Sequence, residues 1–353
     1  MDQSLQHQVS SSYNLDQFTF EPLGEGLIHD TFLLISPKGK FVLQGFNTSV
    51  FRFPERIAAN LSHLKSDLEG KELPFILPLP KSTEEGKEIL QFEGKLYRLF
   101  DFIEGVTIQE TKDPNLAGIA ARAYGAFAQA TAQNTLSNYQ ETIPDFHRLD
   151  LRYEQLEQAA KSKTSWTDEE KNLLEFYLSQ SPLIEQYQKQ IQVLPLRVIH
   201  NDTKINNLIF AEKLDRVVAL IDLDTVMPGY LMYDFGDLVR TMACSRSETQ
   251  TDWENVALVP EIFEALLKGY ISGLGQAVHA EELKSLLLGG EVMTALMGLR
   301  FFTDHVLGNI YYRVHYSEQN LHRAKNQMIL LRDQQQKRDQ LQDIWKKTRP
   351  ARQ

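Results

Sequence analysis

Cysteine is almost absent from this sequence. The 353 residues contain one, Cys244, so no disulfide can form within the chain. A lone thiol suits a reducing compartment, and we expect a cytoplasmic protein in which Cys244 is a small core residue. The first residues are polar and lack the apolar core of a secretion signal. No run approaches the roughly 18 apolar residues that a membrane helix needs, so we predict no membrane association.

Basic residues are also in deficit. Lys and Arg number 37 against 47 Asp and Glu, which gives a formal net charge of −10. The sequence therefore lacks the basic footprint of a nucleic-acid-binding protein, and we predict no nucleic-acid partner. An anionic small molecule is still possible, because magnesium and local dipoles can dominate the field inside a cleft. The length allows two lobes, each with its own core.

The most informative segment is VIHNDTKINNLIF, followed closely by VVALIDLDTVMPG. Within it, Asp202 and Asn207 have the spacing D-x-x-x-x-N, and Asp222 comes later at the end of an apolar strand. Kinase-fold phosphotransferases present a catalytic base, a metal-binding amide and a metal-binding carboxylate in this order. Asp202 would accept the proton of an attacking hydroxyl. Asn207 and Asp222 would offer the neutral and anionic oxygens that magnesium prefers.

A hairpin predicted from residues 207–210 and 216–221 would return Asn207 and Asp222 to the same end. Taken singly, an Asp in a loop is usually a turn or cap residue, and His200 is typical of a structural histidine that bonds its own loop. The ordered combination is what favours a phosphotransferase. For Asp224, a metal contact and a structural role remain equally open. Asp234 and Asp237 are expected to brace the catalytic loop.

The N-terminal part of the chain has the pattern of a small antiparallel sheet. Strands are predicted at 18–23, 31–35, 41–44, 89–92 and 95–102, with a polar arm at 1–14 and a helix at 54–70. The loop between the first two strands contains Gly24 and Gly26, which would let backbone amides approach phosphate, and it ends at Asp30. An ordinary hairpin turn is the alternative for this loop.

The rest of the predicted nucleotide site lies on later strands. Gln44 occupies the third strand, where protein kinases carry a lysine that grips the phosphates. A neutral amide cannot balance the negative charge of the phosphates, so magnesium or a cation from elsewhere must supply more of the positive charge. Phe100 and Phe102 lead into a hinge at which adenine would meet backbone groups, with Gly105 as a pivot.

From residue 114 onward the pattern is mainly helical. Helices are predicted at 116–133, 151–161, 167–190, 253–274, 281–309 and 322–347. We therefore expect an α+β protein with a bilobal, protein-kinase-like fold. Its small antiparallel-sheet N-lobe would span 1–104, and its large, mainly helical C-lobe, with the catalytic loop, metal site and acceptor pocket, would span 105–353.

These motifs resemble the aminoglycoside phosphotransferase and choline kinase group, and most closely the N-acetylhexosamine 1-kinases. The similar phrases are IHDTFLL (28–34), FVLQGFNTSVF (41–51), HNDTKINNLIF (200–210), IDLDTVMPG (221–229), YDFGDLVR (233–240) and RFFTDHV (300–306). The resemblance implies ATP and Mg²⁺ as cofactors and the anomeric hydroxyl of GlcNAc or GalNAc as acceptor. The sugar kinases also carry Gln at the position of Gln44.

The acceptor is expected between the catalytic loop and the C-terminal helices. Asp202 would meet the reacting hydroxyl, and Arg300, Asp304, Tyr311 and His29 are the candidates for the rest of the sugar. An intrahelical ion pair is the alternative for Arg300 and Asp304, which are four residues apart, and Tyr311 could equally be a core residue.

Three functions fit this sequence. The first is an ATP-dependent sugar 1-kinase, an enzyme that transfers phosphate to an alcohol group. The second is a kinase of the same fold for another small acceptor, such as a different sugar, an amino alcohol or an aminoglycoside. The third is a catalytically silent, nucleotide-binding kinase fold, for which Gln44 is the one argument. A monomer or a homodimer is compatible with each.

Overall fold

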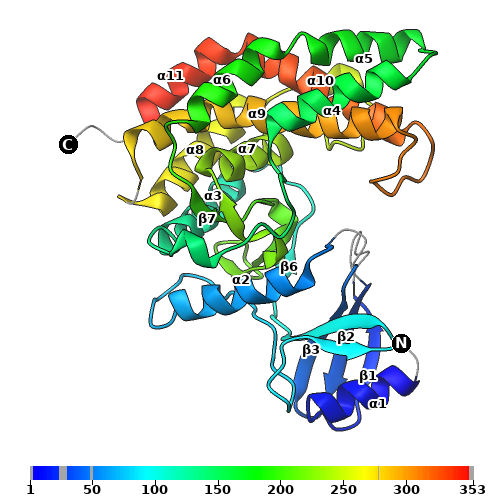
Figure 1. The fold of residues 1–353 in the computed structure, drawn as a ribbon. Helices are drawn as coiled ribbons and strands as arrows, with labels where there is room; N and C mark the ends of the chain where they lie inside the picture. The colour runs from blue at the N-terminus through cyan, green and yellow to red at the C-terminus, as the bar shows by residue number, and fades with distance from the viewer. Residues whose placement is uncertain (1–2, 24–29, 48–50, 277, 350–353) are drawn as a thin grey trace.

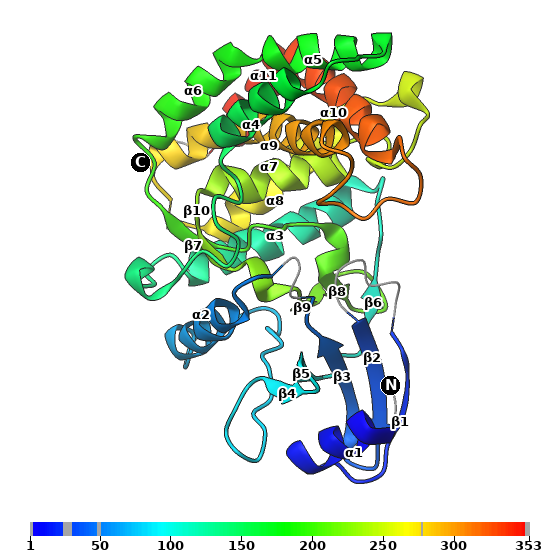
Figure 2. The same ribbon diagram turned by 45° about the vertical axis from the view of Figure 1, so that its right-hand side comes forward.

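The computed structural model describes residues 3–23, 30–47, 51–276 and 278–349, and it shows a chain of two unequal parts. A small β-sheet with one helix lies at one end, and a larger helical part lies at the other (Figures 1 and 2). The α+β class and the division into a small antiparallel sheet and a mostly helical part are thus confirmed.

The small sheet contains the five predicted strands. These are β1 (Thr19–Pro22), β2 (Asp30–Ser36), β3 (Gly39–Gly45), β4 (Leu90–Phe92) and β5 (Lys95–Asp101), in the order β1-β2-β3-β5-β4 with every neighbouring pair antiparallel. Leu43 and Leu99 pair across the sheet and are fully buried on its core face. Gln44 pairs with Arg98, one residue along each strand, so both belong to the opposite face.

The predicted N-terminal arm is instead a helix, α1 (Gln3–Ser12). Leu5 and Val9, one turn apart, are buried in the cluster that includes Leu43 and Leu99. The prediction was wrong because the helix is polar on all its other positions, and two apolar residues are too few to reveal a helical period.

Helix α2 (Pro54–Asp67) begins with proline in its first turn, as predicted. Its buried side chains, Ile57, Leu61 and Leu64, belong to the core of the helical part rather than to that of the sheet. The amide of Asn60 also donates to the backbone oxygen of Val226, at 2.9 Å. The helix therefore docks on the helical part, and Figure 1 shows it between the two parts.

The larger part combines short strands with helices. Its short elements are β6 (Val106–Thr107), η1 (Leu136–Asn138), β7 (Arg197–Ile199), η2 (Ile205–Asn207), β8 (Leu208–Phe210), β9 (Val217–Leu220), η3 (Leu223–Thr225), β10 (Met227–Gly229) and η4 (Trp253–Asn255). Its helices are α3 (Pro114–Ala130), α4 (Leu149–Ser162), α5 (Asp168–Leu178), α6 (Ser181–Ile191), α7 (Leu231–Met242), α8 (Pro260–Leu274), α9 (Ala280–Val306), α10 (Gln319–Gln336) and α11 (Arg338–Thr348). Two predicted long helices, 167–190 and 322–347, are each divided in two.

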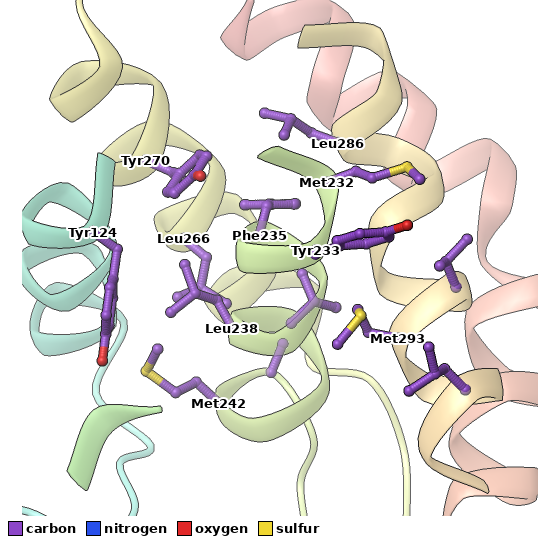
Figure 3. Packing of buried hydrophobic residues seen from close by; sticks show 14 of the residues in the cluster. Tyr124, Met232, Tyr233, Phe235, Leu238, Met242, Leu266, Tyr270, Leu286 and Met293 are labelled. Atoms are coloured by element: carbon purple, nitrogen blue, oxygen red, sulfur yellow. The ribbon is translucent and has the colours of Figure 1, made fainter. Parts of the chain in front are cut away.

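Helix α9 runs through the core of the helical part. It is long and apolar enough to cross a membrane, with a mean hydropathy of 1.3 over an 18-residue window, but 78% of that window is buried inside the protein. The expectation that no run approaches such a length therefore overlooked this helix. Its apolar residues pack against the neighbouring helices, including α7 and α10. Figure 3 shows part of this core, with Phe235 and Leu238 of α7 among the side chains drawn. Cys244 is buried in the same cluster, as predicted.

Helices α3 and α8 cross at glycines. A Cβ atom added at Gly269 would lie 2.2 Å from the backbone oxygen of Gly118, and one added at Gly125 would lie 2.3 Å from that of Tyr270. The two backbones therefore approach more closely than a methyl group allows. This contact also affects the predicted catalytic loop, which lies between β7 and β8. The hydroxyl of Tyr124 on α3 donates to the backbone oxygen of Lys204 in that loop, at 2.7 Å.

We expect Gly269→Ala to reduce the free energy of unfolding by about 1–3 kcal/mol, because the methyl group forces the two helices apart. Gly118→Ala is the matched control on the facing helix, since its Cβ would lie 3.4 Å from the nearest atom, the backbone oxygen of Ala265. It should be neutral, or stabilising by up to about 1 kcal/mol through helix propensity. Urea unfolding followed by circular dichroism compares the two, and equal effects would contradict the crossing described.

Candidate active site

The loop between β7 and β8 contains the predicted catalytic residues, and Asp234 of α7 holds its backbone. The two carboxylate oxygens of Asp234 accept the N–H groups of Asn201 at 2.7 Å and His200 at 3.1 Å. Its backbone oxygen accepts the hydroxyl of Thr203 at 2.6 Å. Burial raises the pKa of Asp234 to about 7, and the two N–H donors oppose that rise. The bracing role predicted for Asp234 is confirmed, whereas Asp237 bonds Arg240 instead.

Asn201 adopts a left-handed backbone conformation, with φ of 63°. Its side-chain amide donates to the backbone oxygens of Thr225 and Met227, each at 3.1 Å. The strained residue is therefore held from both sides, by Asp234 at its own N–H and by the segment after β9 at its side chain.

His200 is a structural histidine, as predicted. It is fully buried, with its ring edge against Tyr124 and Phe127. Its Nδ1 accepts the N–H of Asp202 at 3.3 Å, so its Nε2 carries the proton and donates to the backbone oxygen of Ile221 at 3.0 Å. Burial lowers the pKa of His200, which keeps this tautomer neutral. The ring thus ties the catalytic loop to the end of β9.

Asp202 and Asn207 are in direct contact. The amide nitrogen of Asn207 donates to Asp202 Oδ2 at 2.9 Å and to the backbone oxygen of Asp202 at 2.8 Å. Lys204 Nζ lies 2.6 Å from the other carboxylate oxygen. Burial favours a higher pKa for Asp202, but the Lys204 ammonium and the Asn207 amide outweigh it and the pKa is lowered. The carboxylate is therefore anionic, as an acceptor for a hydroxyl proton must be.

The hairpin brings Asp222 to the same place. Ile221 N–H donates to the backbone oxygen of Asn207 at 3.0 Å, and Leu208 pairs with Leu220. Asp222 is exposed and has a left-handed backbone, with φ of 59°. Strained non-glycine residues of this kind concentrate at functional sites.

These residues fit a magnesium ion. Because the amide nitrogen of Asn207 is engaged with Asp202, its oxygen faces away from that carboxylate and accepts no hydrogen bond from the residues that the structure describes. Magnesium is usually bound by one or two carboxylates together with substrate phosphates, not by an all-protein cage. The described ranges contain no group of three or more His, Cys, Asp or Glu able to hold a metal.

Asp224 and Gln44 meet at a residue that the sequence reasoning missed, Arg98. Its guanidinium binds both carboxylate oxygens of Asp224, at 2.5 and 2.6 Å, and donates to Gln44 Oε1 from Nε and Nη2, at 2.9 and 2.6 Å. The side chains of Arg98 and Asp224 are 4% and 1% exposed. An arginine in the middle of an apolar strand is unusual, and that signal was available in the sequence.

Arg300, a predicted acceptor residue, is linked to the loop between β7 and β8 through two residues, His147 and Phe146. The backbone oxygen of Asn201 accepts from His147 Nε2 at 2.9 Å, and the ring of His147 lies tilted against that of Phe146, with 4.2 Å between the ring centres. The guanidinium of Arg300 lies 5.1 Å from the centre of Phe146 and 5.3 Å from that of Tyr311. The structure therefore groups Arg300 and Tyr311 with the catalytic loop, and Phe146 and His147 were not foreseen.

Asp304 points into a loop. Its oxygens accept the N–H groups of Tyr311 and Tyr312, at 2.8 and 3.0 Å, and the amide of Asn320 at 2.9 Å. Among the described residues, the Asp304 carboxylate therefore bonds this loop and Asn320 rather than forming the intrahelical ion pair with Arg300. Tyr311 is 49% exposed, so the alternative of a core residue is wrong.

Only the end of the predicted nucleotide loop, at Asp30, lies within the described residues. Gly24, Gly26 and His29 lie outside the described residues, while Asp30 is exposed at the start of β2. Phe100 lies on the same face of the sheet as Gln44, and Phe102 follows β5. Gly105 has φ of +156°, and a Cβ there would lie 2.5 Å from the backbone oxygen of Phe210. This close approach explains the glycine where the chain enters the larger part.

Comparisons with known proteins agree with this arrangement. The pattern of the phosphotransferase enzyme family, APH, matches residues 19–279. An aminopropanol kinase associated with a microcompartment is 14% identical, with a TM-score of 0.62 over 93% of this chain and 95% of that chain. A choline kinase from Cryptosporidium parvum Iowa II is 17% identical, with a TM-score of 0.56 over 92% and 90%. A spectinomycin phosphotransferase in complex with ADP and spectinomycin is 14% identical, with a TM-score of 0.57 over 92% and 93%.

At these identities the likeness is one of fold, and it confirms the predicted kinase-like fold. The resemblance to the aminoglycoside phosphotransferase and choline kinase group is confirmed as well. The narrower similarity to the N-acetylhexosamine 1-kinases stays a prediction.

We expect His147 to make the stability of the protein depend on pH. Burial, aided by the charge of Arg300, lowers the pKa of His147 from 6.5 to about 3, and its Nδ1 is buried without a hydrogen-bond partner among the described residues. Between these values the unfolded chain binds a proton that the folded chain does not, so stability falls as the pH falls. From about pH 7 to about pH 5 this residue should cost about 2 kcal/mol.

Urea unfolding of the wild type and of His147→Gln at both pH values measures this cost. Gln keeps a donor for the backbone oxygen of Asn201 but does not titrate. The loss of stability on acidification should therefore be smaller in the variant by about 2 kcal/mol. His200 is unchanged in both proteins, so its contribution cancels. Equal losses would show that His147 is not held neutral.

Proposed function

The chain belongs to the phosphotransferase enzyme family APH, and we propose that it is an ATP- and magnesium-dependent kinase for the anomeric hydroxyl of an N-acetylhexosamine such as GlcNAc or GalNAc. One observation carries the proposed chemistry. An anionic Asp202 is hydrogen-bonded to Asn207, and the β8–β9 hairpin sets Asp222 beside Asn207. A proton acceptor and two oxygen ligands for a hard cation thus share one place.

Each residue has a distinct part in a direct transfer. Asp202 orients the sugar hydroxyl and takes up its proton late in a loose transition state. The Asn207 oxygen and the Asp222 carboxylate would hold Mg²⁺, which neutralises charge on the phosphates when bound. Lys204, 2.6 Å from Asp202, keeps that carboxylate ionised between turnovers. No nucleophilic side chain is required, so we expect no phosphorylated enzyme intermediate.

The charge on the acceptor side supports a sugar over a cationic acceptor. Arg300 and Arg152 are close enough for the charge of Arg300 to contribute to lowering the pKa of Arg152, to about 10, although burial is the larger cause. Two guanidiniums would repel choline, an amino alcohol or an aminoglycoside, because each of these acceptors is positively charged. Arg300 with Phe146 and Tyr311 instead offers hydrogen-bond donors and an aromatic wall to a neutral ring.

We also propose His29 and Asp304 as acceptor residues, Asp304 through the backbone of Tyr311. Gly24, Gly26, Asp30, Gln44, Phe100 and Phe102 are proposed to line the nucleotide site. A lobe boundary at residues 104 and 105, a cytoplasmic location and a monomeric or homodimeric state complete the proposal.

The acceptor is tested by measuring ADP release with ATP and Mg²⁺ across free sugars, choline, amino alcohols and aminoglycosides. We expect turnover on GlcNAc or GalNAc and a product that releases phosphate in mild acid, as anomeric phosphates do. Turnover on a cationic acceptor alone would keep the kinase and reject the sugar. No turnover at all, with ATP still bound, would favour a silent kinase fold.

Replacing Asp202 by Asn should reduce turnover by about 10²–10⁴-fold, because the proton acceptor is lost. ATP affinity should be little changed, since Asp202 is assigned to the hydroxyl. Asp215→Asn is the matched control, as Asp215 is an exposed acid beside the far end of the same hairpin. Steady-state rates and ATP calorimetry on the three proteins decide the matter. Full activity in Asp202→Asn would show that another group takes the proton.

A further inference from the structure

We propose that Arg98 is the phosphate-binding cation of this enzyme, replacing the lysine that the third strand lacks, and that Asp224 positions Arg98 instead of binding the metal. This inference rests on the proposed function, because it assigns further residues to the nucleotide site of that kinase. It also gives Gln44 a role, as a neutral partner that orients the guanidinium.

The sheet places Arg98 correctly for this role. Leu43 and Leu99 are buried on the core face, so Gln44, Arg98 and Phe100 share the opposite face. From that face Arg98 reaches Asp224, which lies two residues after Asp222. The guanidinium therefore links the strand that carries the phosphate-binding lysine in protein kinases to the segment that follows the proposed metal ligand.

The contacts of Arg98 fix the position of its guanidinium but do not occupy all of its N–H donors. Asp224 holds Nη1 and Nη2, and Gln44 holds Nε and Nη2. Phe46 and Phe100 lie against the same group, 4.4 and 5.1 Å from ring centre to Cζ. An arginine has five N–H donors, and these bonds leave one hydrogen of Nη1 without an acceptor among the described residues. In the proposed complex, Arg98 would donate that hydrogen to a phosphate oxygen.

The Arg98–Asp224 ion pair is also similar to one that protein kinases use. Protein kinases use an ion pair between a sheet lysine and a carboxylate from outside the sheet to set the phosphate-binding charge. Here Arg98 of β5 pairs with Asp224 of η3, which belongs to the larger part. Arg98 is the one buried cation among the described residues of the small sheet. A carboxylate with both oxygens on a guanidinium is also a poor candidate for a metal ligand, which supports Asp222 in that role.

The test compares the binding of ATP and adenosine by calorimetry, without turnover. Removing Arg98 alone would take its guanidinium away from the buried Asp224 carboxylate, so the variant to use is Arg98→Gln with Asp224→Asn, in which both charges are lost together. We expect ATP affinity to fall by about 10- to 100-fold, the value of a charge-assisted hydrogen bond, and adenosine affinity to stay the same. A merely structural pair would change both ligands or neither.

Asp222→Asn, compared with the double variant Arg98→Gln/Asp224→Asn, separates the two carboxylates. The Mg²⁺ dependence of ATP binding should be lost in Asp222→Asn and retained, at lower ATP affinity, in the double variant. Loss of the Mg²⁺ dependence in the double variant, or unchanged ATP affinity in it when folded, would overturn the inference and leave the proposed kinase in place. A wild-type protein that binds no ATP would overturn the proposed function itself, so the two failures are distinguishable.

Discussion

The backbone N–H groups of His200 and Asn201, bonded to the carboxylate of Asp234, are the constraint on which the site depends. A left-handed asparagine costs about 1–3 kcal/mol, and it persists only where its surroundings over-determine it. Asp234 supplies that constraint from α7, a helix buried along almost its whole length. The position of the loop therefore depends on the helical core, because its backbone is bonded to a side chain of α7.

The core in turn depends on close helix contacts. The glycines of α3 and α8 let these helices meet at backbone distance, and α3 then holds the catalytic loop through Tyr124. Gly236 of α7 meets the backbone of Gly289 on α9 in the same way, since a Cβ there would lie 2.1 Å from its oxygen. A rigid scaffold of this kind suits phosphoryl transfer, in which positioning and electrostatics provide most of the catalysis.

Charge is divided between the two sides of Asp202. The proposed metal side has an exposed Asp222 with a left-handed backbone and the neutral oxygen of Asn207, whereas the proposed acceptor side has Arg300, Arg152 and a histidine kept neutral by burial. Between the sheet and the helical part, Arg98 and Asp224 form a buried pair whose net charge is zero. Removing one member of such a pair costs more than replacing both, because it leaves a buried charge without its counter-ion.

Local pattern alone was sufficient for the strands of the small sheet, for most helix positions, and for placing Asp202, Asn207 and Asp222 close together. These features depend on short-range periodicity and on the geometry of one hairpin, which the sequence carries directly. It did not reveal α1, whose apolar face has only Leu5 and Val9, nor the apolar helix α9 as a core element. Only the tertiary structure decided the partners of side chains distant in sequence: Arg98 with Asp224, His147 with Asn201, and Asp304 with its loop. Such pairings follow from how the layers pack, and no local pattern encodes them.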